Sequence, residues 1–203
     1  MSEPGGFCMW WWRIHQYALD RCGHGDDSLD RMSDTRSLRE RCGHIGALAF
    51  QVYRFGNRTV YGNYPAPIRK LRMLAYQALD LIIVRAVASA RLPAQTRVGE
   101  RIGLVHDANG VILHPDVVIG DDVTIFHQVT IGKQTGEPKR PVIGNGVMIG
   151  AGAKILGNVT VSDYAMIGTN AVVLQDVPEG ATAVGVPARI IPAKPDFERS
   201  PRR

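Results

Sequence analysis

An aliphatic side chain recurs at nearly every sixth position between Leu113 and Val177, and this period constrains the fold more than any other feature of the chain. Its members are Leu113, Ile119, Ile125, Ile131, Ile143, Ile149, Ile155, Val161, Ile167 and Val173. A second set of small or branched residues follows four positions after each member: Val117, Val123, Val129, Thr135, Val147, Ala153, Val159, Ala165, Ala171 and Val177. A period of six fits neither a helix, with about 3.6 residues per turn, nor simple strand alternation. It is typical of hexapeptide repeats, in which short strands joined at corners stack into a parallel β-helix.

Two interruptions break this regularity. Leu104 is out of phase with the later ladder, so the frame must slip within the segment from His106 to Gly110. Between Gly132 and Pro141 the frame is kept, but polar residues replace the aliphatic face: Lys133, Gln134, Glu137, Lys139 and Arg140. Because the coils of a β-helix are otherwise uniform, we expect loops that can carry a site at these two places.

Residues 1–92 lack the six-residue period and show helical spacing instead. One apolar stripe predicts a helix from near Ser33 or Asp34 to Gly56-Asn57, and it consists of Ile45, Leu48, Ala49, Val52 and Phe55. A second stripe predicts a helix from Pro67 to about Ala90, and it consists of Ile68, Leu71, Ala75, Leu79, Ile82 and Ala86. A third short helix is expected near Trp10 to Arg21. The expected organisation is a helical segment (1–92), a β-helix (93–195) and a disordered basic tail (196–203).

Composition excludes several classes of protein. The chain is 45% hydrophobic and 21% charged, which is typical of a globular protein. Its net charge of +5 accompanies no nucleic-acid-binding motif, so we expect no nucleic-acid partner. The longest apolar stretch, Leu79 to Ala90, is too short to span a bilayer and contains charges. No signal peptide is recognisable, and we expect a cytoplasmic chain without a transmembrane segment, in which Trp10 to Trp12 are buried rather than in a membrane interface.

The cysteines do not indicate a disulfide framework or a metal site. The chain has three cysteines, Cys8, Cys22 and Cys42. An odd number of cysteines without a Cys-x-x-Cys pair favours reduced thiols. Arg-Cys-Gly-His occurs twice, at residues 21–24 and 41–44, but a Cys-x-His pair is not the usual spacing of zinc ligands. We therefore expect no metal.

Histidine is the remaining candidate for chemistry. His106 coincides with the phase slip, for which core packing gives no reason. A neutral imidazole there can take a proton from a hydroxyl near neutral pH, as a general base must. His114 and His127 also lie in the repeat, where a structural role is the alternative reading for each.

The motifs of the second half resemble one known family. They are Leu104-Val105-His106 with Asn109-Gly110-Val111, Val129-Thr130-Ile131-Gly132, the run from Ile149 to Asn158, and Gly185-Val186-Pro187-Ala188-Arg189-Ile190. With them, the segment from Val98 to Ile191 resembles the catalytic domain of the serine acetyltransferase family. These are acetyl-CoA-dependent O-acetyltransferases with a left-handed parallel β-helix. The resemblance thus implies a mainly β chain with an α-helical N-terminal segment for assembly.

The resemblance also implies roles for particular residues. His106 becomes the general base, with Asp107 and His127 as further catalytic candidates. Family acetyl-CoA sites lie between the solenoids of a trimer, so a homotrimer or a dimer of trimers is implied. The implied acetyl-CoA contacts are Gly132, Ala151 and Lys154, and the implied acceptor contacts are Lys139, Arg140 and Asn109.

Departures from the family pattern leave the acceptor open. Serine-specific members carry an Asp immediately before the catalytic His and an Arg-His pair in the loop, where this chain has Val105 and Lys139-Arg140. Asp107 or Glu100 could supply the orienting carboxylate instead. The chain also resembles a shorter branch associated with polysaccharide synthesis, through Tyr53-Arg54-Phe55-Gly56-Asn57 and His127-Gln128-Val129-Thr130-Ile131-Gly132.

Three functions follow from these observations. The first is acetyl transfer to L-serine, and the second is acetyl transfer to a sugar hydroxyl in polysaccharide or glycan synthesis. The third, more remote, is a metal-dependent hydratase of the γ-carbonic-anhydrase kind, which needs a close pair of ligand histidines that His114 and His127 do not obviously give.

Overall fold

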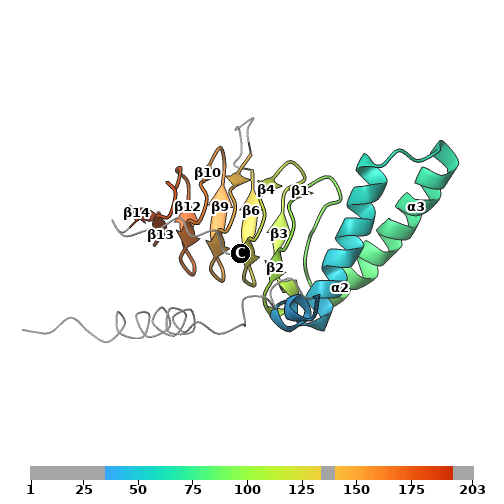
Figure 1. Cartoon of the computed structure of the whole chain (residues 1–203), viewed down its shortest axis with the longest axis horizontal. Helices are drawn as coiled ribbons and strands as arrows, with labels where there is room; N and C mark the ends of the chain where they lie inside the picture. The colour runs from blue at the N-terminus through green and yellow to red at the C-terminus, as the bar shows by residue number, and fades with distance from the viewer. Residues whose placement is uncertain (1–34, 134–139, 194–203) are drawn as a thin grey trace, which may run out of the picture. The chain divides into compact units, whose positions relative to one another are not determined.

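The computed structural model describes residues 35–133 and 140–193, with side chains from Ile45 onward. All of these belong to one compact unit, in which a helical hairpin precedes a stack of short strands (Figure 1). Several sequence predictions lie outside the described residues: the helix near Trp10 to Arg21, the environments of Cys8 and Cys22, and the basic tail. None of the described helices is long and apolar enough to cross a membrane.

The first helix, α2 (Thr35–Tyr61), continues past the predicted end at Gly56-Asn57. The sequence reading was wrong there because Gly56 serves close packing and does not end the helix. A Cβ atom on Gly56 would lie 2.4 Å from the ring of Tyr76, in the next helix. Asn57 remains helical while its side chain donates hydrogen bonds to the carbonyl oxygens of Ala94 (2.9 Å) and Thr96 (3.0 Å).

The second helix consists of α3 (Ala66–Leu79) and the π-helix η2 (Asp80–Val87). The helix predicted from Pro67 to about Ala90 is confirmed, but its apolar stripe is not the buried face, because Leu71 and Ile82 are 69% and 60% exposed. The buried face is formed instead by Tyr76, Asp80, Val84 and Ala88. These residues recur at every fourth position, which suits the wider turn of the π-helix, in which hydrogen bonds join residues five apart.

Three sheets of short strands form the triangular stack. The first contains β1 (Arg97–Val98), β4 (Val118–Ile119), β7 (Val142–Ile143) and β10 (Thr160–Val161). The second contains β2 (Gly103–Leu104), β5 (Thr124–Ile125), β8 (Met148–Ile149), β11 (Met166–Ile167), β13 (Thr182–Val184) and β14 (Arg189–Ile191). The third contains β3 (Ile112–Leu113), β6 (Thr130–Gly132), β9 (Lys154–Leu156) and β12 (Val172–Val173). From β1 to β12 every third strand joins the same sheet, and β13 and β14 extend the second sheet. All pairs are parallel except β13–β14, so the predicted β-helix is confirmed.

The strand register confirms both interruptions. Gly103 pairs with Thr124, and Ile112 pairs with Thr130. The distance along the chain between paired residues is three positions longer in the first pair than in the second. Three extra positions therefore lie between β2 and β3, where the frame slips. Ile119 pairs with Ile143, an offset longer than that of Ile112 by one whole hexapeptide. The polar segment between β6 and β7 thus adds a full repeat and leaves the frame unchanged.

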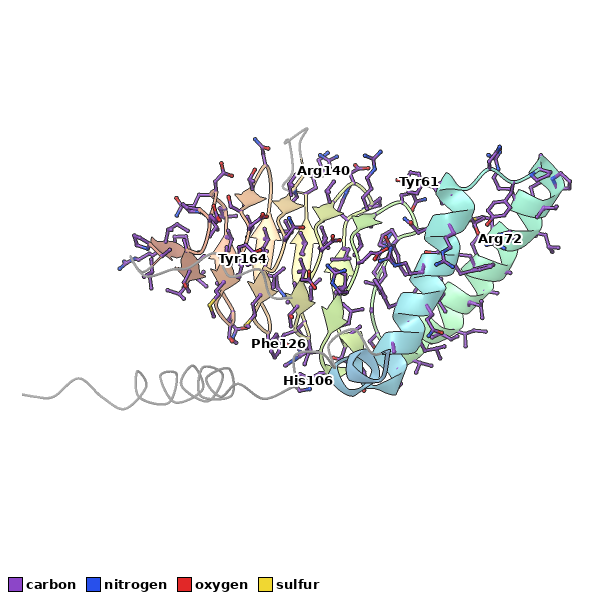
Figure 2. All side chains as sticks on the ribbon, viewed as in Figure 1. Tyr61, Arg72, His106, Phe126, Arg140 and Tyr164 are labelled. Atoms are coloured by element: carbon purple, nitrogen blue, oxygen red, sulfur yellow. The ribbon has the colours of Figure 1, made fainter. Side chains whose placement is uncertain are left out.

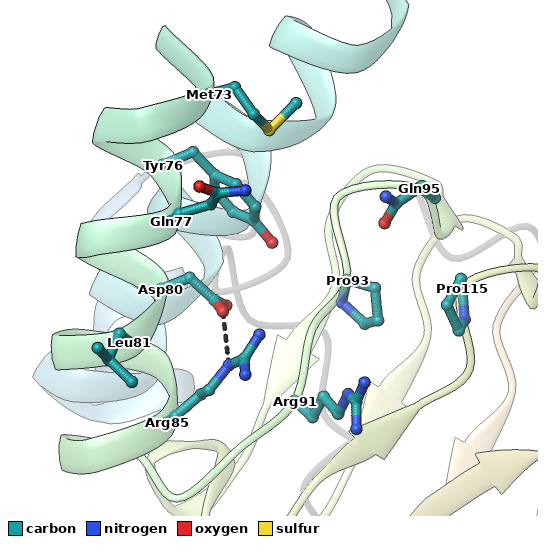
Figure 3. Close-up of a pocket in the computed structure, with 10 residues that line it drawn as sticks. All are labelled: Met73, Tyr76, Gln77, Asp80, Leu81, Arg85, Arg91, Pro93, Gln95 and Pro115. Carbon is teal, nitrogen blue, oxygen red and sulfur yellow. Dashed lines mark hydrogen bonds and ion pairs between the residues drawn. The ribbon is translucent and has the colours of Figure 1, made fainter. Parts of the chain in front are cut away.

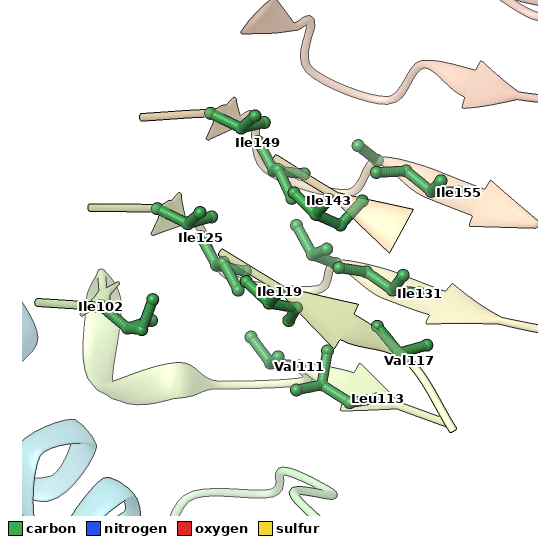
Figure 4. Close-up of a cluster of buried hydrophobic side chains, with 14 of the residues drawn as sticks. Ile102, Val111, Leu113, Val117, Ile119, Ile125, Ile131, Ile143, Ile149 and Ile155 are labelled. Atoms are coloured by element: carbon green, nitrogen blue, oxygen red, sulfur yellow. The ribbon is translucent and has the colours of Figure 1, made fainter. Parts of the chain in front are cut away.

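The aliphatic ladder fills the centre of the stack (Figure 4). Every member from Leu113 to Val173 is at most 3% exposed, and the second set is equally buried apart from Thr135, which lies outside the described residues. Complete burial of one such aliphatic side chain contributes about 1.5–3 kcal/mol. The repeat is therefore the main source of stability in the solenoid.

Helix α2 is attached to the first coil by polar side chains. The Tyr53 hydroxyl donates a hydrogen bond to the Thr96 carbonyl oxygen (2.6 Å), and Arg54 donates to the carbonyl oxygens of Val98 (3.2 Å) and Gly99. Together with Asn57, these residues explain the Tyr-Arg-Phe-Gly-Asn motif. It joins the helix to the chain segment that enters the solenoid.

Candidate active site

The backbone excursion between β2 and β3 forms one turn, η3 (His106–Ala108). His106, Asp107 and Ala108 have φ angles of 56°, 59° and 60°, a left-handed conformation in three successive residues other than glycine. Such residues cost roughly 1 kcal/mol or more each and persist only where surrounding structure holds them. Ala108 is completely buried, whereas the His106 side chain is exposed. The turn therefore holds an imidazole at the surface of the coil.

The ring of His106 contacts two rings of the next coil (Figure 2). Its centroid lies 6.1 Å from that of Phe126 and 5.0 Å from that of His127, with the two imidazoles nearly perpendicular at 84°. The structure thus brings together His106 and His127, two of the three predicted catalytic residues. Their separation along the chain equals the register offset between β2 and β5, and this was a sequence signal for the pair.

Asp107, the third predicted catalytic residue, faces helix α2. Its carboxylate oxygen Oδ1 accepts hydrogen bonds from the backbone N–H groups of Ile45 (3.2 Å) and Gly46 (3.3 Å). Among the ion pairs between described side chains, none involves His106. Phe126 was not predicted from the sequence, because an aromatic residue at a coil corner gave no distinguishing signal.

The predicted acetyl-CoA contacts lie on or beside the sheet of β6 and β9. Gly132 pairs with Leu156 across these strands, and the Lys154 ammonium donates a hydrogen bond to the Gln128 carbonyl oxygen at 2.5 Å. Ala151 precedes β9 at a half-buried corner. A Cβ atom on Gly132 would meet only Leu156 Cδ2, at 3.9 Å. The fold itself therefore does not require glycine at this position.

The predicted acceptor contacts are separated in one chain. Asn109 follows the His106 turn and its carbonyl oxygen accepts a hydrogen bond from the Gln128 N–H (2.7 Å), while Lys139 lies outside the described residues. Arg140 lies at the opposite edge of the solenoid from His106 (Figure 2), with its Nε 3.4 Å from Asp116 Oδ2. Asp116 was not predicted, although its spacing from Arg140 equals the register offset between β4 and β7.

A separate cavity of about 520 Å³ lies between the second helix and the first coil (Figure 3). The buried carboxylate of Asp80 accepts a hydrogen bond from Arg85 Nε there at 2.7 Å. This spacing of five positions suits the π-helix. None of the predicted site residues lines this cavity, so it is distinct from the surface around His106.

The arrangement favours proton transfer by an imidazole. An exposed histidine at a fixed corner can act as a general base for a bound hydroxyl. The described residues hold no group of three or more His, Cys, Asp or Glu side chains that could bind a metal ion. The histidines of the hydratase alternative have different neighbours, since His114 contacts Asp116 and His127 contacts His106.

Comparisons with known proteins agree with this class of site. Residues 140–175 match the family model "Bacterial transferase hexapeptide (six repeats)", so the fold is of the hexapeptide-repeat class. Serine acetyltransferase of Haemophilus influenzae is 50% identical over 109 residues, which are 50% of this chain and 40% of that protein. The chain spans about half the length of the curated relatives it matches.

Solved structures show the same relationship over more of the chain. The apoenzyme of soybean serine acetyltransferase has a TM-score of 0.65 and 37% identity, covering 82% of this chain and 70% of that one. The soybean enzyme complexed with serine has a TM-score of 0.64 and 35% identity, covering 81% and 65%. A serine acetyltransferase in complex with CoA has a TM-score of 0.59 and 38% identity, covering 70% and 55%. The chain belongs to the serine acetyltransferase family, and its solenoid is a left-handed parallel β-helix.

Proposed function

We propose that the chain is an acetyl-CoA-dependent O-acetyltransferase with L-serine as the acceptor. The observation that carries the proposal is the exposed imidazole of His106 on a strained turn of a serine acetyltransferase solenoid. Solved relatives are complexed with serine and with CoA, which supports both substrates.

In the proposed reaction, a His106 ring nitrogen takes the proton of the serine hydroxyl as its oxygen attacks the thioester carbonyl carbon. The new C–O bond forms, the C–S bond breaks, and the imidazolium returns its proton to the CoA sulfur. This direct transfer needs the two substrates close together and a donor for the oxyanion, and it requires no covalent enzyme intermediate. The absence of a Ser or Cys nucleophile motif in the sequence is consistent with this route.

The surface of β6 and β9 is the proposed binding site for acetyl-CoA. Gly132 and Ala151 would let the pantetheine arm approach the backbone, and Lys154 would contribute a positive charge for its phosphates. Lys154 already reaches the Gln128 carbonyl, one residue after His127, so its charge lies near the histidine pair.

A sugar hydroxyl is the second candidate acceptor, within polysaccharide biosynthesis. The observation that favours it is the surroundings of His106. Val105 precedes the histidine where serine-specific members carry an Asp, and the neighbouring carboxylate of Asp107 binds α2. Arg140 is likewise engaged by Asp116.

We also propose a homotrimer or a dimer of trimers in the cytoplasm. His106 and Arg140 lie at opposite edges of the solenoid and in different coils, so a neighbouring copy would be needed to bring both to one acceptor. Acetyl-CoA, the proposed donor, is an intracellular metabolite. Sedimentation analysis of the purified full chain would measure the assembly directly.

A thiol-release assay tests the proposed function. Purified protein and acetyl-CoA are combined separately with L-serine, other hydroxy amino acids and nucleotide sugars. We expect turnover with L-serine and its loss in His106→Gln, which keeps a polar side chain of similar length. Turnover with a nucleotide sugar alone would replace serine as the acceptor, and CoA release in the histidine variant at the wild-type rate would remove His106 as the base. Stoichiometric zinc in protein that releases no CoA with any acceptor would favour the hydratase.

A further inference from the structure

Helix α2 lies directly against the turn that carries His106. The Asp107 carboxylate binds two helix N–H groups, of Ile45 and Gly46, that belong to a distant part of the chain. Hydrogen bonds to a charged acceptor are worth more than those between neutral groups. The contact joins the helical segment to the residue next to the proposed base.

Gly46 makes this close approach possible. A Cβ atom at Gly46 would lie 3.1 Å from Asp107 Cα, 3.2 Å from Asp107 C and 3.2 Å from the Leu104 carbonyl oxygen. All three are backbone atoms, which cannot rotate away as a flexible side chain can. The helix backbone therefore packs so closely on the turn backbone that a methyl group at Gly46 would require the turn to move by a few tenths of an ångström.

The turn needs such support because of its conformation. Three successive residues, none of them glycine, have positive φ angles. Within the turn, the Asn109 N–H donates a hydrogen bond to the His106 carbonyl oxygen (3.1 Å), and the Val111 N–H donates one to the Ala108 carbonyl oxygen (3.0 Å). Strained backbone persists when surrounding structure determines it more strongly than local preference does. The Asp107 carboxylate supplies two longer-range bonds to the same turn.

We infer that Asp107 is a positioning residue, whose carboxylate holds the strained turn on α2 and thereby holds the His106 ring against Phe126 and His127. The inference rests on the proposed role of His106 as base. Asp107 acts on the reaction through the backbone and makes no contact with the imidazole nitrogens. Helix α2 is then part of the catalytic apparatus of each subunit.

Two substitutions of Asp107 test this role. Asp107→Asn keeps an oxygen that can accept from both N–H groups and tolerates the left-handed conformation, while it removes the charge. Asp107→Gly relieves the φ strain but removes the carboxylate. We expect kcat of the Asn variant within about threefold of wild type, and kcat of the Gly variant reduced about tenfold or more, with KM for acetyl-CoA unchanged in both. Equal large losses in both variants would assign Asp107 a charged role toward the imidazole instead and overturn the inference.

Gly46 provides a test from the helix side. Gly46→Ala adds a methyl group that presses on the Asp107 backbone and should displace the turn, so kcat should fall as in Asp107→Gly although alanine favours helix formation. Leu48→Ala, on the exposed side of the same helix, is the matched control and should retain wild-type kcat. Wild-type kcat in Gly46→Ala would contradict the inference.

Hydrogen exchange separates this inference from the proposed function. In Asp107→Gly the amides of Ile45 and Gly46 should exchange faster than in wild type, and in Asp107→Asn they should exchange at nearly the wild-type rate. This comparison does not depend on the acceptor. Unchanged amide exchange in Asp107→Gly would overturn the positioning role. If exchange is faster in Asp107→Gly but the wild-type protein releases no CoA with any acceptor, the attachment to α2 is supported and the proposed function is overturned.

Discussion

The imidazole rings of His106 and His127 meet edge to face, with their centroids 5.0 Å apart. The Nδ1 atom of His127 is buried and has no hydrogen-bond partner among the described residues. A buried polar atom without a partner is costly, and in native proteins such an atom usually serves a ligand, a water or a functional site. The ring that carries Nδ1 lies beside the proposed base, so a substrate bound at His106 is one partner that could satisfy this atom.

Substitution of His127 by two amides distinguishes its ring nitrogens. Asn places a polar atom near the position of Nδ1, and Gln places one near Nε2. If a bound substrate contacts Nδ1, His127→Gln should raise the KM of that substrate by about two- to tenfold, the value of one neutral hydrogen bond, and His127→Asn should raise it less. Steady-state kinetics with each substrate varied in turn measure both. Wild-type constants in His127→Phe would show that the ring only fills space.

Gly132→Ala separates the needs of the fold from those of acetyl-CoA. The added Cβ would meet only Leu156 Cδ2 at an ordinary 3.9 Å, so the free energy of unfolding should change by less than about 0.5 kcal/mol. If the pantetheine arm approaches this backbone, KM for acetyl-CoA should rise severalfold while KM for the acceptor stays constant. Urea unfolding and kinetics on the same preparation test both parts, and an unchanged KM for acetyl-CoA would place the cofactor arm elsewhere.

The solenoid was predictable because its sequence period and its structural period are the same. Each ladder position must be aliphatic to fill a narrow core, and the extra positions at η3 and before β7 show directly in the spacing. The helices were predicted less well. Gly56 indicated a helix end, but it is needed where Tyr76 of the next helix packs on α2.

The site was predictable where the coil register determines it. His106 with His127, and Asp116 with Arg140, occupy equivalent positions of consecutive coils, so their contacts follow from the pairing of β2 with β5 and of β4 with β7. The contact of Asp107 with Ile45 and Gly46 joins the helical segment to the solenoid, and no repeat relates the two. Local spacing therefore could not reveal that Asp107 faces the helix.

Gly56→Ala should destabilise the helical hairpin. Its Cβ atom would lie 2.4 Å from two ring carbons of the buried Tyr76, so the ring or the helix must move. Such overpacking costs about 1–3 kcal/mol. Gly103→Ala is the matched control, because its Cβ atom would approach nothing closer than 3.7 Å. Urea unfolding midpoints should fall for Gly56→Ala alone, and equal midpoints for the two variants would contradict this packing argument.

Alkaline pH should weaken the fold through Tyr53 and Tyr76. Burial raises the pKa of each hydroxyl from 10.0 to about 12. Between these values the unfolded chain has lost protons that the folded chain retains. The contribution of the two tyrosines to the free energy of unfolding is therefore constant below pH 10 and falls as pH rises toward 12. Tyr53→Phe removes one such group and should make the fall shallower by up to about 1.4 kcal/mol per pH unit. Unfolding curves across this alkaline range measure the slope, and identical slopes would contradict the assignment to Tyr53.

Asp116→Asn tests whether the Arg140 guanidinium is positioned for an acceptor. Asp116 is 62% exposed, so the ion pair adds less than about 1 kcal/mol to stability. The Arg140 side chain is only 17% exposed, and the carboxylate 3.4 Å from its Nε restricts its direction. Loss of the charge should raise KM severalfold for an acceptor that carries a carboxylate, such as serine, and leave KM for acetyl-CoA unchanged. Asp122→Asn, which removes the exposed partner of Arg101 at 2.7 Å, is the matched control and should change neither constant. If KM for serine is unchanged in Asp116→Asn and the protein turns over a sugar acceptor, Arg140 has no role in amino-acid recognition. A saccharide is then the favoured acceptor.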